Sequence, residues 1–384
     1  MSVHTGTAAT APPAVDTATS AHGPGSDGGR GPRRPTARHH VPLHHVLRDR
    51  VLRRPISPTG PTSSTSSTGS TRPARPTRRA ARRRGRLIAG AATVLAALMV
   101  LNPWLPNGPL SLASLWQTVL PWSGLGIALL LLLAALRRSA PAAVAVLLPA
   151  LVWTVLFAPA LVDKRAGGGD FTVVSHNVNE DNPDPLRTAR ALAGSGADVV
   201  AVEELARGAQ ETFRRELAAT YAFAEVHGGI ALWSKYPLKD VEPVEIMPWT
   251  RALRATVITP KGPVALYTAH LASVRVRPDA GFTTFARNEA AARLAAAVQR
   301  EPLTRTIVMG DLNGSFDDSA LRSLTGPLRS AQQEAGDGFG FTWPASLPVV
   351  RIDQILVKGI TARSAWTLPD TGSDHLPVAA SLKL

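Results

Sequence analysis

Residues 306–314 read TIVMGDLNG, and residues 373–378 read SDHLPV. In the first stretch an apolar run stops at a glycine and continues into Asp311 and Asn313. In the second, Asp374 and His375 stand directly before another apolar run, residues 378–382. Short apolar runs bounded by Gly, Asp, Asn or Ser predict strands. Both stretches therefore predict a strand that carries chemically active side chains at one end.

Other predicted strands carry polar residues in the same way. His176 and Asn177 follow the run 171–174, Glu203 and Glu204 follow 199–202, His270 closes 264–270, and Asp353 lies in 352–357. Strand ends that project polar groups to one rim can build a rigid site. Because the chain has no cysteine, the available oxygen and amide ligands favour magnesium or manganese over zinc.

Around these residues the pattern predicts a mixed α and β domain over residues 163–384. The predicted strands are 171–174, 199–202, 230–234, 255–259, 264–270, 306–309, 352–357 and 378–382. Three segments with helical character separate some of them: 185–193, 209–219 and 287–300. Several strands interleaved with few helices favour a sheet-on-sheet core flanked by helices.

Each motif alone has an ordinary structural explanation. A pair of glutamates after a strand is usually a solvated turn, Asp-x-Asn beside glycine is usually turn chemistry, and a histidine at a strand end is often structural. The occurrence of all six groups in order along one domain is much harder to obtain by chance. We therefore favour a functional site.

Residues 168–384 resemble the endonuclease/exonuclease/phosphatase superfamily, which includes nucleases, neutral sphingomyelinases and inositol polyphosphate phosphatases. The motifs that carry the resemblance are Gly310-Asp311-Leu312-Asn313, the segment 373–378 and, in support, residues 198–204. The resemblance implies an α/β fold, a four-layer α/β sandwich of two packed mixed β-sheets flanked by helices. It also implies a divalent metal and a phosphate-ester substrate.

By motif, the resemblance assigns Glu204 as the principal metal ligand, with Asn177 and Asp374 near the same ion. Asp311 and Asn313 would position the phosphate and the attacking water. His375 would be the general base or a transition-state stabiliser, oriented by Asp353, and His270 would assist the leaving oxygen or bind phosphate. A metal ion, a base and a group that stabilises the departing oxygen suffice for hydrolysis.

Two departures from the family pattern bear on the site. The residue before the ligand glutamate is commonly glutamine and here is Glu203, which is expected to add charge near the ion and to alter metal preference. The domain is also short, without the long insertions that shape substrate choice in larger members. Arg254, Asn179 and Asn288 are candidate phosphate or second-sphere contacts, with a structural role equally open.

The basic character of the chain lies in its first 86 residues. The whole chain has a formal charge of +14, and residues 1–86 contain sixteen arginines against three aspartates. Residues 163–384 are close to neutral, with 24 basic and 25 acidic residues. Residues 1–86, rich in Pro, Gly, Ser, Thr and Arg, are expected to be disordered. The arginine cluster 78–86 is a nucleic-acid patch or, more in keeping with its position, a juxtamembrane cluster.

Three apolar stretches follow within residues 87–162: 87–105, 121–136 and 140–162. The first and third reach the length of a transmembrane helix, and the second does so only if it begins near Leu115. Buried helices of a soluble domain are the alternative explanation. Only one charged pair, Arg137 and Arg138, interrupts the three stretches, which favours about three transmembrane helices.

Basic residues predict the topology. The arginine cluster and the Arg137-Arg138 pair both favour the cytoplasmic side, so a multi-pass plasma-membrane protein with an external C-terminal domain is expected. Asp163-Lys164-Arg165 is a weak signal for the opposite orientation.

The leading hypothesis is a membrane-anchored, metal-dependent phosphoesterase, either a nuclease or a phospholipid head-group phosphodiesterase. The near-neutral domain lacks the basic stripe expected of tight duplex binding. Its partners would be the substrate and the lipid bilayer, and no obligate protein partner is inferred. The alternatives are a non-catalytic envelope module that retained the fold, and a transporter part, which the lack of ionisable residues in the apolar stretches disfavours.

Overall fold

Two six-stranded mixed sheets form the centre of the C-terminal domain in the computed structural model, which describes residues 78–384 and their side chains from Gly85 onward. The first sheet has the order β13-β14-β1-β2-β4-β3. Its strands are β1 (Phe171–Asn177), β2 (Val199–Glu203), β3 (Phe223–His227), β4 (Ile230–Ser234), β13 (Thr361–Thr367) and β14 (Val378–Lys383). β1 is parallel to β2 and antiparallel to β14.

The second sheet has the order β11-β12-β10-β7-β6-β5. Its strands are β5 (Leu238–Pro243), β6 (Ala252–Thr259), β7 (Gly262–Ala269), β10 (Thr306–Asp311), β11 (Arg329–Ser330) and β12 (Asp353–Lys358). A small hairpin, β8 (Val276–Arg277) and β9 (Gly281–Phe282), stands apart from both sheets. Each of the eight predicted strands is present, and the sequence missed β3, β5, β11, β13 and this hairpin.

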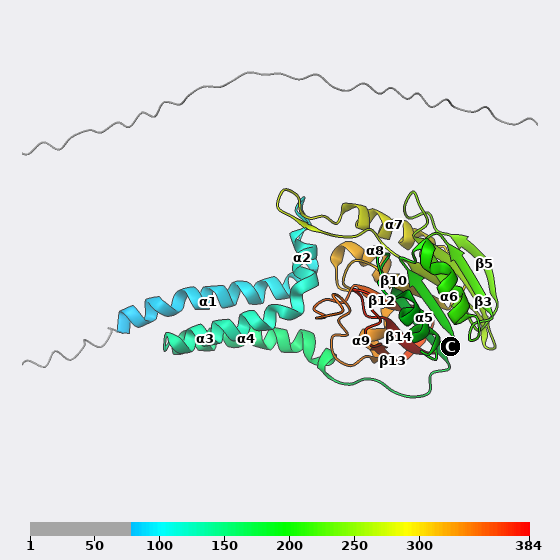
Figure 1. Cartoon of the computed structure of the whole chain (residues 1–384). Coiled ribbons are helices and arrows are strands. Elements are labelled where there is room, and N and C mark those ends of the chain that lie inside the picture. The colour runs from blue at the N-terminus through cyan, green and yellow to red at the C-terminus, as the bar shows by residue number, and fades with distance from the viewer. Residues whose placement is uncertain (1–77) are drawn as a thin grey trace, which may run out of the picture. The chain divides into compact units, whose positions relative to one another are not determined.

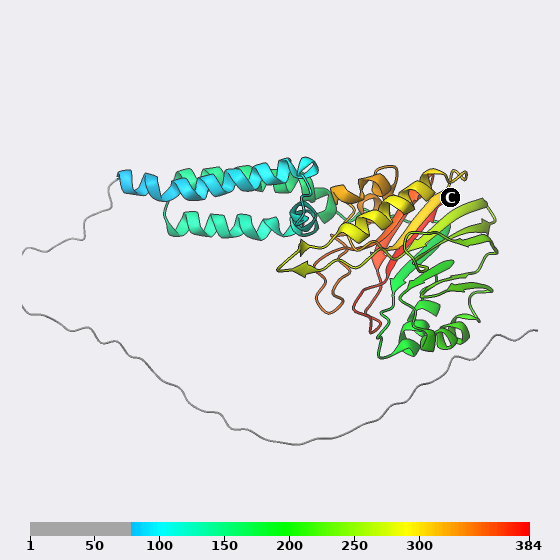
Figure 2. The same ribbon diagram turned by 90° about the horizontal axis from the view of Figure 1, so that it is seen from above.

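The sheets pack face to face, and helices cover their outer faces (Figures 1 and 2). Aliphatic side chains such as Val173 and Val199 from the first sheet meet Leu266 and Ile307 from the second in one buried core. α5 (Pro185–Ala193) and α6 (Gln210–Leu217) cover the first sheet, and α7 (Phe285–Gln299) and α8 (Arg322–Thr325) cover the second. The prediction of two packed mixed sheets flanked by helices is confirmed.

Local sequence explains why the predicted helices form where they do. α5 begins at Pro185, and the side chain of its N-cap residue Asp184 accepts a hydrogen bond from the Arg187 amide. Proline at the first helical position and aspartate at the N-cap are both favourable. Gly194 follows as the C-cap residue. The helix therefore occupies the predicted residues 185–193.

Within the described residues, four α-helices precede the C-terminal domain. They are α1 (Arg78–Val100), α2 (Leu112–Val119), α3 (Ser123–Leu136) and α4 (Ala140–Phe157), with short 3-10 turns η1 (Asn102–Trp104), η2 (Leu120–Trp122) and η3 (Ala158–Leu161). α1, α3 and α4 contact one another through small and aliphatic residues and run side by side (Figure 1). The tail predicted to be disordered spans residues 1–86, and its residues 1–77 lie outside the described part of the chain. From Arg78 onward the chain is helical, so the predicted boundary at residue 86 falls within α1.

In the part of the chain that the structure describes, two helical stretches are long and apolar enough to cross a membrane by length and composition. They are Leu112–Leu136 and Ala140–Leu161, while Gly85–Val100 is shorter. The predicted spans 121–136 and 140–162 lie within or overlap these stretches. The first stretch is interrupted at η2, where Pro121 stands, and α2 leaves the direction of α3 (Figure 1). Three transmembrane helices remain a prediction.

The remaining short elements lie in the C-terminal domain. They are η4 (Arg207–Ala209), η5 (Ser319–Leu321) and α9 (Ala331–Ala335). η5 follows the loop after β10, and α2 packs against it. The described residues, 78–384, belong to one compact unit, which includes helices α1 to α4 and both sheets.

Candidate active site

The polar residues predicted from strand ends gather at one rim of the two sheets. Asn177 is the last residue of β1, Glu204 follows β2, His270 follows β7, and Asp311 ends β10. Asp353 begins β12 directly opposite Asp311 in the antiparallel pair. Strand pairing within each sheet, and the packing of the two sheets, thus bring together residues that are far apart in the chain.

Asp311 is at the centre of this group. Its Oδ2 accepts hydrogen bonds from Asn177 Nδ2 and Asn313 Nδ2, both at 3.1 Å. Its Oδ1 accepts the Asn313 amide at 2.8 Å. Burial raises the pKa of Asp311 to about 7, and the charge of Asp353 acts in the same direction. The carboxyl group is therefore able to exchange a proton near neutral pH.

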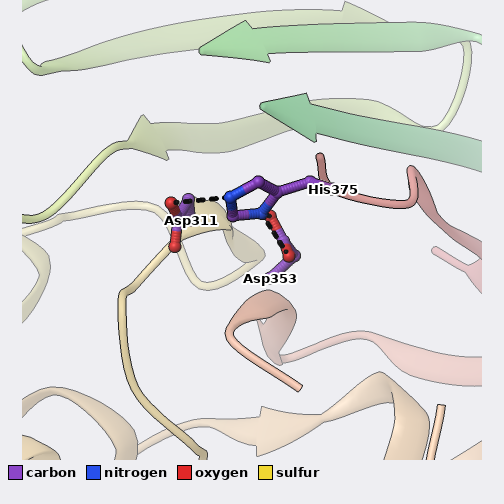
Figure 3. Close-up of side chains that lie close together, drawn as sticks. All are labelled: Asp311, Asp353 and His375. Atoms are coloured by element: carbon purple, nitrogen blue, oxygen red, sulfur yellow. Dashed lines mark hydrogen bonds and ion pairs between the residues drawn. The ribbon is translucent and has the colours of Figure 1, made fainter. Parts of the chain in front are cut away.

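His375 approaches Asp311 from the first sheet, held by Asp353 (Figure 3). The ring Nδ1 lies 2.9 and 3.1 Å from the two Asp353 oxygens, and Nε2 lies 3.9 Å from Asp311 Oδ2. Burial by itself would lower the pKa of His375, but the Asp353 carboxylate raises it to about 10. The pKa of Asp353, which burial would raise, is lowered by the charge of His375. His375 is accordingly an imidazolium at neutral pH, which favours the stabiliser over the base among its two predicted roles.

His270 approaches Asp311 from the second sheet and has a different neighbour. Its Nε2 lies 3.6 Å from Asp311 Oδ2 and 3.4 Å from Glu204 Oε1, while Arg251 Nη1 contacts its Nδ1. Burial lowers the pKa of His270 to about 3, and the charge of Arg251 adds to this effect. His270 is therefore neutral. With Arg251 donating to Nδ1, the proton is on Nε2 and points toward the two carboxylates.

Arg251 is a site residue that the sequence analysis missed. β6 begins at Ala252, three residues before the predicted start at residue 255. In the sheet, Ala252 lies opposite Ala269 of β7. The His270 amide donates to the Arg251 carbonyl at 2.8 Å, so the register places the two residues opposite each other. Extending the predicted strand 255–259 to residue 252 would have found this neighbour.

The two adjacent glutamates point in different directions. Glu204 has a left-handed backbone with a φ of 56°, and its partly exposed carboxylate accepts the Glu180 amide at 3.4 Å. Glu203 is fully buried between the sheets, where its Oε1 accepts from Ser175 and Thr268, both at 2.9 Å. Burial raises the pKa of Glu203 to about 8. The expectation that Glu203 adds charge beside the ion is therefore wrong, because the carboxyl group is turned inward and neutral at pH 7.

The structure does not bring all the remaining candidates to the rim. Asp374 is exposed, and its Oδ2 accepts from the Trp343 indole at 3.3 Å. Arg254 pairs with Glu301 at 3.1 Å, and Asn288 accepts from Arg287 at 2.7 Å. Asn179 lies at the site, where its amide donates to Asn177 Oδ1 at 3.0 Å. The roles of Arg254 and Asn288 in this structure are thus structural, and that of Asp374 stays a prediction.

A divalent metal ion fits the oxygen-rich side of this rim. Ligand atoms of Asp311, Asp353 and His375 lie within 4.8 Å of one another. However, the Nδ1 of His375 is bonded to Asp353, so only its Nε2 could reach a metal ion. Glu204, Asn177 and Asp311 offer carboxylate and amide oxygens, the ligands of magnesium and manganese. The predicted ligands Glu204 and Asn177 belong to this set.

Comparison with known proteins agrees with this description. Residues 174–375 match the Endonuclease/Exonuclease/phosphatase family, a span that includes every predicted site residue. Among curated proteins, none matches the sequence.

Solved structures with similar chains include three bacterial proteins. Beta toxin of Staphylococcus aureus is 17% identical, with a TM-score of 0.44 over 55% of this chain and 99% of its own. The mannosyl-6-phosphatase of Bacteroides thetaiotaomicron is 16% identical, with a TM-score of 0.46 over 56% of this chain and 100% of its own. An endonuclease/exonuclease/phosphatase of Bacteroides vulgatus is 18% identical, with a TM-score of 0.48 over the same shares. Because the family match extends over more than half of the sequence, the chain belongs to the endonuclease/exonuclease/phosphatase family.

Proposed function

We propose that the chain is a divalent-metal-dependent hydrolase of phosphate esters that acts at the outer face of a membrane. The observation that carries the activity is the position of Asp311, which lies between the Nε2 atoms of His375 and His270 at 3.9 and 3.6 Å. A carboxylate able to accept a proton thus faces one cationic and one neutral hydrogen-bond donor. Hydrolysis of a phosphate ester needs these functions at one point.

Each residue has a defined task in this proposal. Glu204 and Asn177 would hold the metal ion, which supplies charge neutralisation for the phosphate when bound. Asp311 would accept a proton from the attacking water, because a base with a pKa near the working pH is the most effective. Asn313 keeps Asp311 oriented and places an amide beside it. The His375 imidazolium would stabilise negative charge on the phosphate oxygens. The His270 Nε2–H would donate a hydrogen bond to the leaving oxygen, which then takes its proton from solvent.

The helical region supports a membrane attachment. Leucine and valine side chains such as Leu125, Leu132, Leu147 and Val155 are exposed on α3 and α4, each more than half accessible. Contiguous exposed apolar surface of this kind is rare in soluble proteins and typical of contact with lipid. α3 alone, with fourteen residues, is about 21 Å long at 1.5 Å per residue, shorter than the roughly 30 Å hydrocarbon core. It would need the apolar residues of η2 or local thinning of the bilayer.

The net charge of the C-terminal domain and the proposed membrane attachment both bear on the substrate class. The C-terminal domain is close to neutral, so tight binding to a nucleic-acid backbone is not favoured. A phosphodiester in a lipid head group would be available at the membrane surface at high local concentration. A nuclease that digests nucleic acid through weak binding is the other member of the same phosphodiesterase class.

The activity is tested with the full chain purified in detergent. Bis(4-nitrophenyl) phosphate, 4-nitrophenyl phosphate, plasmid DNA, RNA, sphingomyelin and phosphoinositide vesicles are incubated with magnesium, alongside Asp311→Asn as an inactive control. Turnover of any substrate by wild type and not by the variant supports the proposal, and the substrate identifies the class. No turnover of any of them, with a folded protein, would overturn it in favour of a binding module.

The proposed topology has its own measurement. Protease added to intact cells should remove residues beyond about 165 and leave an N-terminal tag intact, since the basic residues favour the cytoplasm. A protected C-terminal tag on intact cells, cleaved only after permeabilisation, would reverse the orientation.

A further inference from the structure

The segment between α1 and α3 is docked on the C-terminal domain through polar side chains. Ser111 Oγ lies 2.8 Å from Thr284 Oγ1, and the Phe282 amide donates to the Leu110 carbonyl at 2.9 Å. Gln117 Oε1 accepts from the Ser319 amide at 2.8 Å. Ser111, Ser114 and Gln117 are all buried. A helix that buries serine and glutamine against a domain is part of that domain's packing rather than a linker.

A fully buried ion pair lies under this helix. Arg287 of α7 and Asp318 have no exposed side-chain surface, and their closest atoms are 2.7 Å apart. Ser114 Oγ of α2 donates to Asp318 Oδ1 at 2.9 Å and in turn accepts from Asn107 Nδ2 at 2.8 Å. A buried ion pair is tolerated only when further hydrogen bonds satisfy its remaining atoms. α2 supplies one of those bonds.

The ion pair reaches the active site through the main chain of Asn313. Arg287 Nη1 donates to the Asn313 carbonyl at 3.2 Å. Gly314 makes this approach possible, because a Cβ at that position would lie 2.4 Å from the same Nη1. The amide and the side chain of Asn313 both bond Asp311. A short hydrogen-bonded route therefore joins Ser114 to Asp311 through Asp318, Arg287 and Asn313.

We propose that α2 is part of the active-site scaffold and that Ser114 is a positioning residue, which acts on the reaction through Asn313. The helical region, through α2, then affects the rate of hydrolysis as well as the location of the enzyme. The inference rests on the proposed hydrolase activity for its kinetic consequence. Its structural consequence, a fixed conformation of the loop after β10, does not depend on that activity.

The test compares Ser114→Ala with Ser111→Ala in the full chain in detergent, with bis(4-nitrophenyl) phosphate and magnesium. Each variant removes one buried hydroxyl from the docked segment, so similar losses of thermal stability are expected. Ser111 bonds neither Arg287 nor Asp318 directly and reaches Arg287 only through Thr284 and Asn288. It is therefore the control for a buried hydroxyl of the same segment without a direct bond to the ion pair. We expect Ser114→Ala to lower kcat about 10-fold, the scale of one hydrogen bond, and Ser111→Ala to leave kcat within about twofold.

A double-mutant cycle separates positioning from general destabilisation. If Ser114 acts through Asn313, the Ser114→Ala change should have no further effect on kcat in an Asn313→Ala background. An equal loss in both backgrounds, or an equal loss in Ser111→Ala, would show that α2 contributes only stability and would overturn the proposal.

Amide hydrogen exchange decides the question without catalysis. Exchange at residues 312–316 should become faster in Ser114→Ala and remain unchanged in Ser111→Ala. If wild type proved inactive, the proposed function would fail, and the exchange result would still stand for or against the scaffold. Unchanged exchange in Ser114→Ala would refute it.

Discussion

The two sides of the rim each present a histidine to Asp311, and the two histidines differ in charge. His375 comes from the first sheet and is held by a carboxylate, which raises its pKa to about 10. His270 comes from the second sheet and is buried beside Arg251, and its pKa is lowered to about 3. Their Nε2 atoms lie at similar distances from the same oxygen. The neighbour of each ring therefore decides its chemistry, and residue type alone does not.

The largest effect is expected from the metal ion, whose proposed ligand Glu204 lies beside His270, with its Oε1 3.4 Å from the ring Nε2. EDTA should abolish activity, and magnesium should restore it. Glu204→Gln should shift the magnesium titration to higher concentration, with part of the rate recovered in excess metal, because one charged ligand is lost. The initial rate against magnesium measures both. Full turnover in metal-free buffer would show that the site works without an ion.

His375→Ala should lower kcat about 10²–10⁴-fold, the usual scale for a group that moves or stabilises charge in the transition state. Extra magnesium should not help, since Glu204 and Asn177, the proposed ligands of the ion, are unchanged in this variant. Circular dichroism serves as the folding control. If metal rescued His375→Ala and did not rescue Glu204→Gln, the assignment would be wrong: His375 would hold the metal ion and Glu204 would not.

Arg251→Ala should lower kcat about 10- to 100-fold, because His270 loses the donor that orients its ring. A fall of that size corresponds to the free energy of one hydrogen bond from a charged group. Arg254→Ala is the matched control three residues away. Arg254 pairs with the buried Glu301 outside the site, so its loss should lower the melting temperature and leave kcat near wild type. Comparable kcat losses in both variants would mean that Arg251 acts only through stability.

Glu203→Gln should have the smallest effect on rate and a specific effect on stability. The Glu203 carboxyl joins Ser175 of the first sheet to Thr268 of the second. Its pKa rises from 4.5 to about 8 on folding. A raised carboxyl pKa stabilises the fold below the unfolded value and loses that stabilisation as pH rises through the folded value.

Glutamine keeps the shape and cannot ionise. Relative to Glu203→Gln, wild type should therefore lose stability between about pH 4.5 and 8, by an amount on the order of a few kcal/mol. Urea unfolding of both proteins at pH 5 and pH 8.5 measures the difference. A constant difference across that range would mean that Glu203 is ionised in the fold.

The central strands and most of the rim could be predicted from the sequence, because apolar runs and the polar residues that end them are local patterns. β3, β5 and β13 could not, because they are edge strands with few or no buried residues and no regular alternation of buried and exposed positions. Arg251 was missed because it belongs to no motif and acquires its role only from the register of β6 with β7.

Asp374 and Glu203 show a second limit of the sequence. A motif gives the order of residues but not the direction in which each side chain points. Asp374 turns to Trp343, and Glu203 turns inward while its neighbour Glu204 turns to the rim. The charge state of each histidine also depends on contacts between segments far apart in the chain.

The docking of α2 also has a consequence for the time course of synthesis. Ser114 and Asp318 are 204 residues apart in the chain. At about 5–20 residues per second, α2 leaves the ribosome roughly 10–40 s before its partner exists. An isolated helix of fewer than about 12 residues is marginal in water, and α2 has eight. α2 is therefore synthesised among the first described elements. It becomes stable among the last, once the loop after β10 has been synthesised and can bind it.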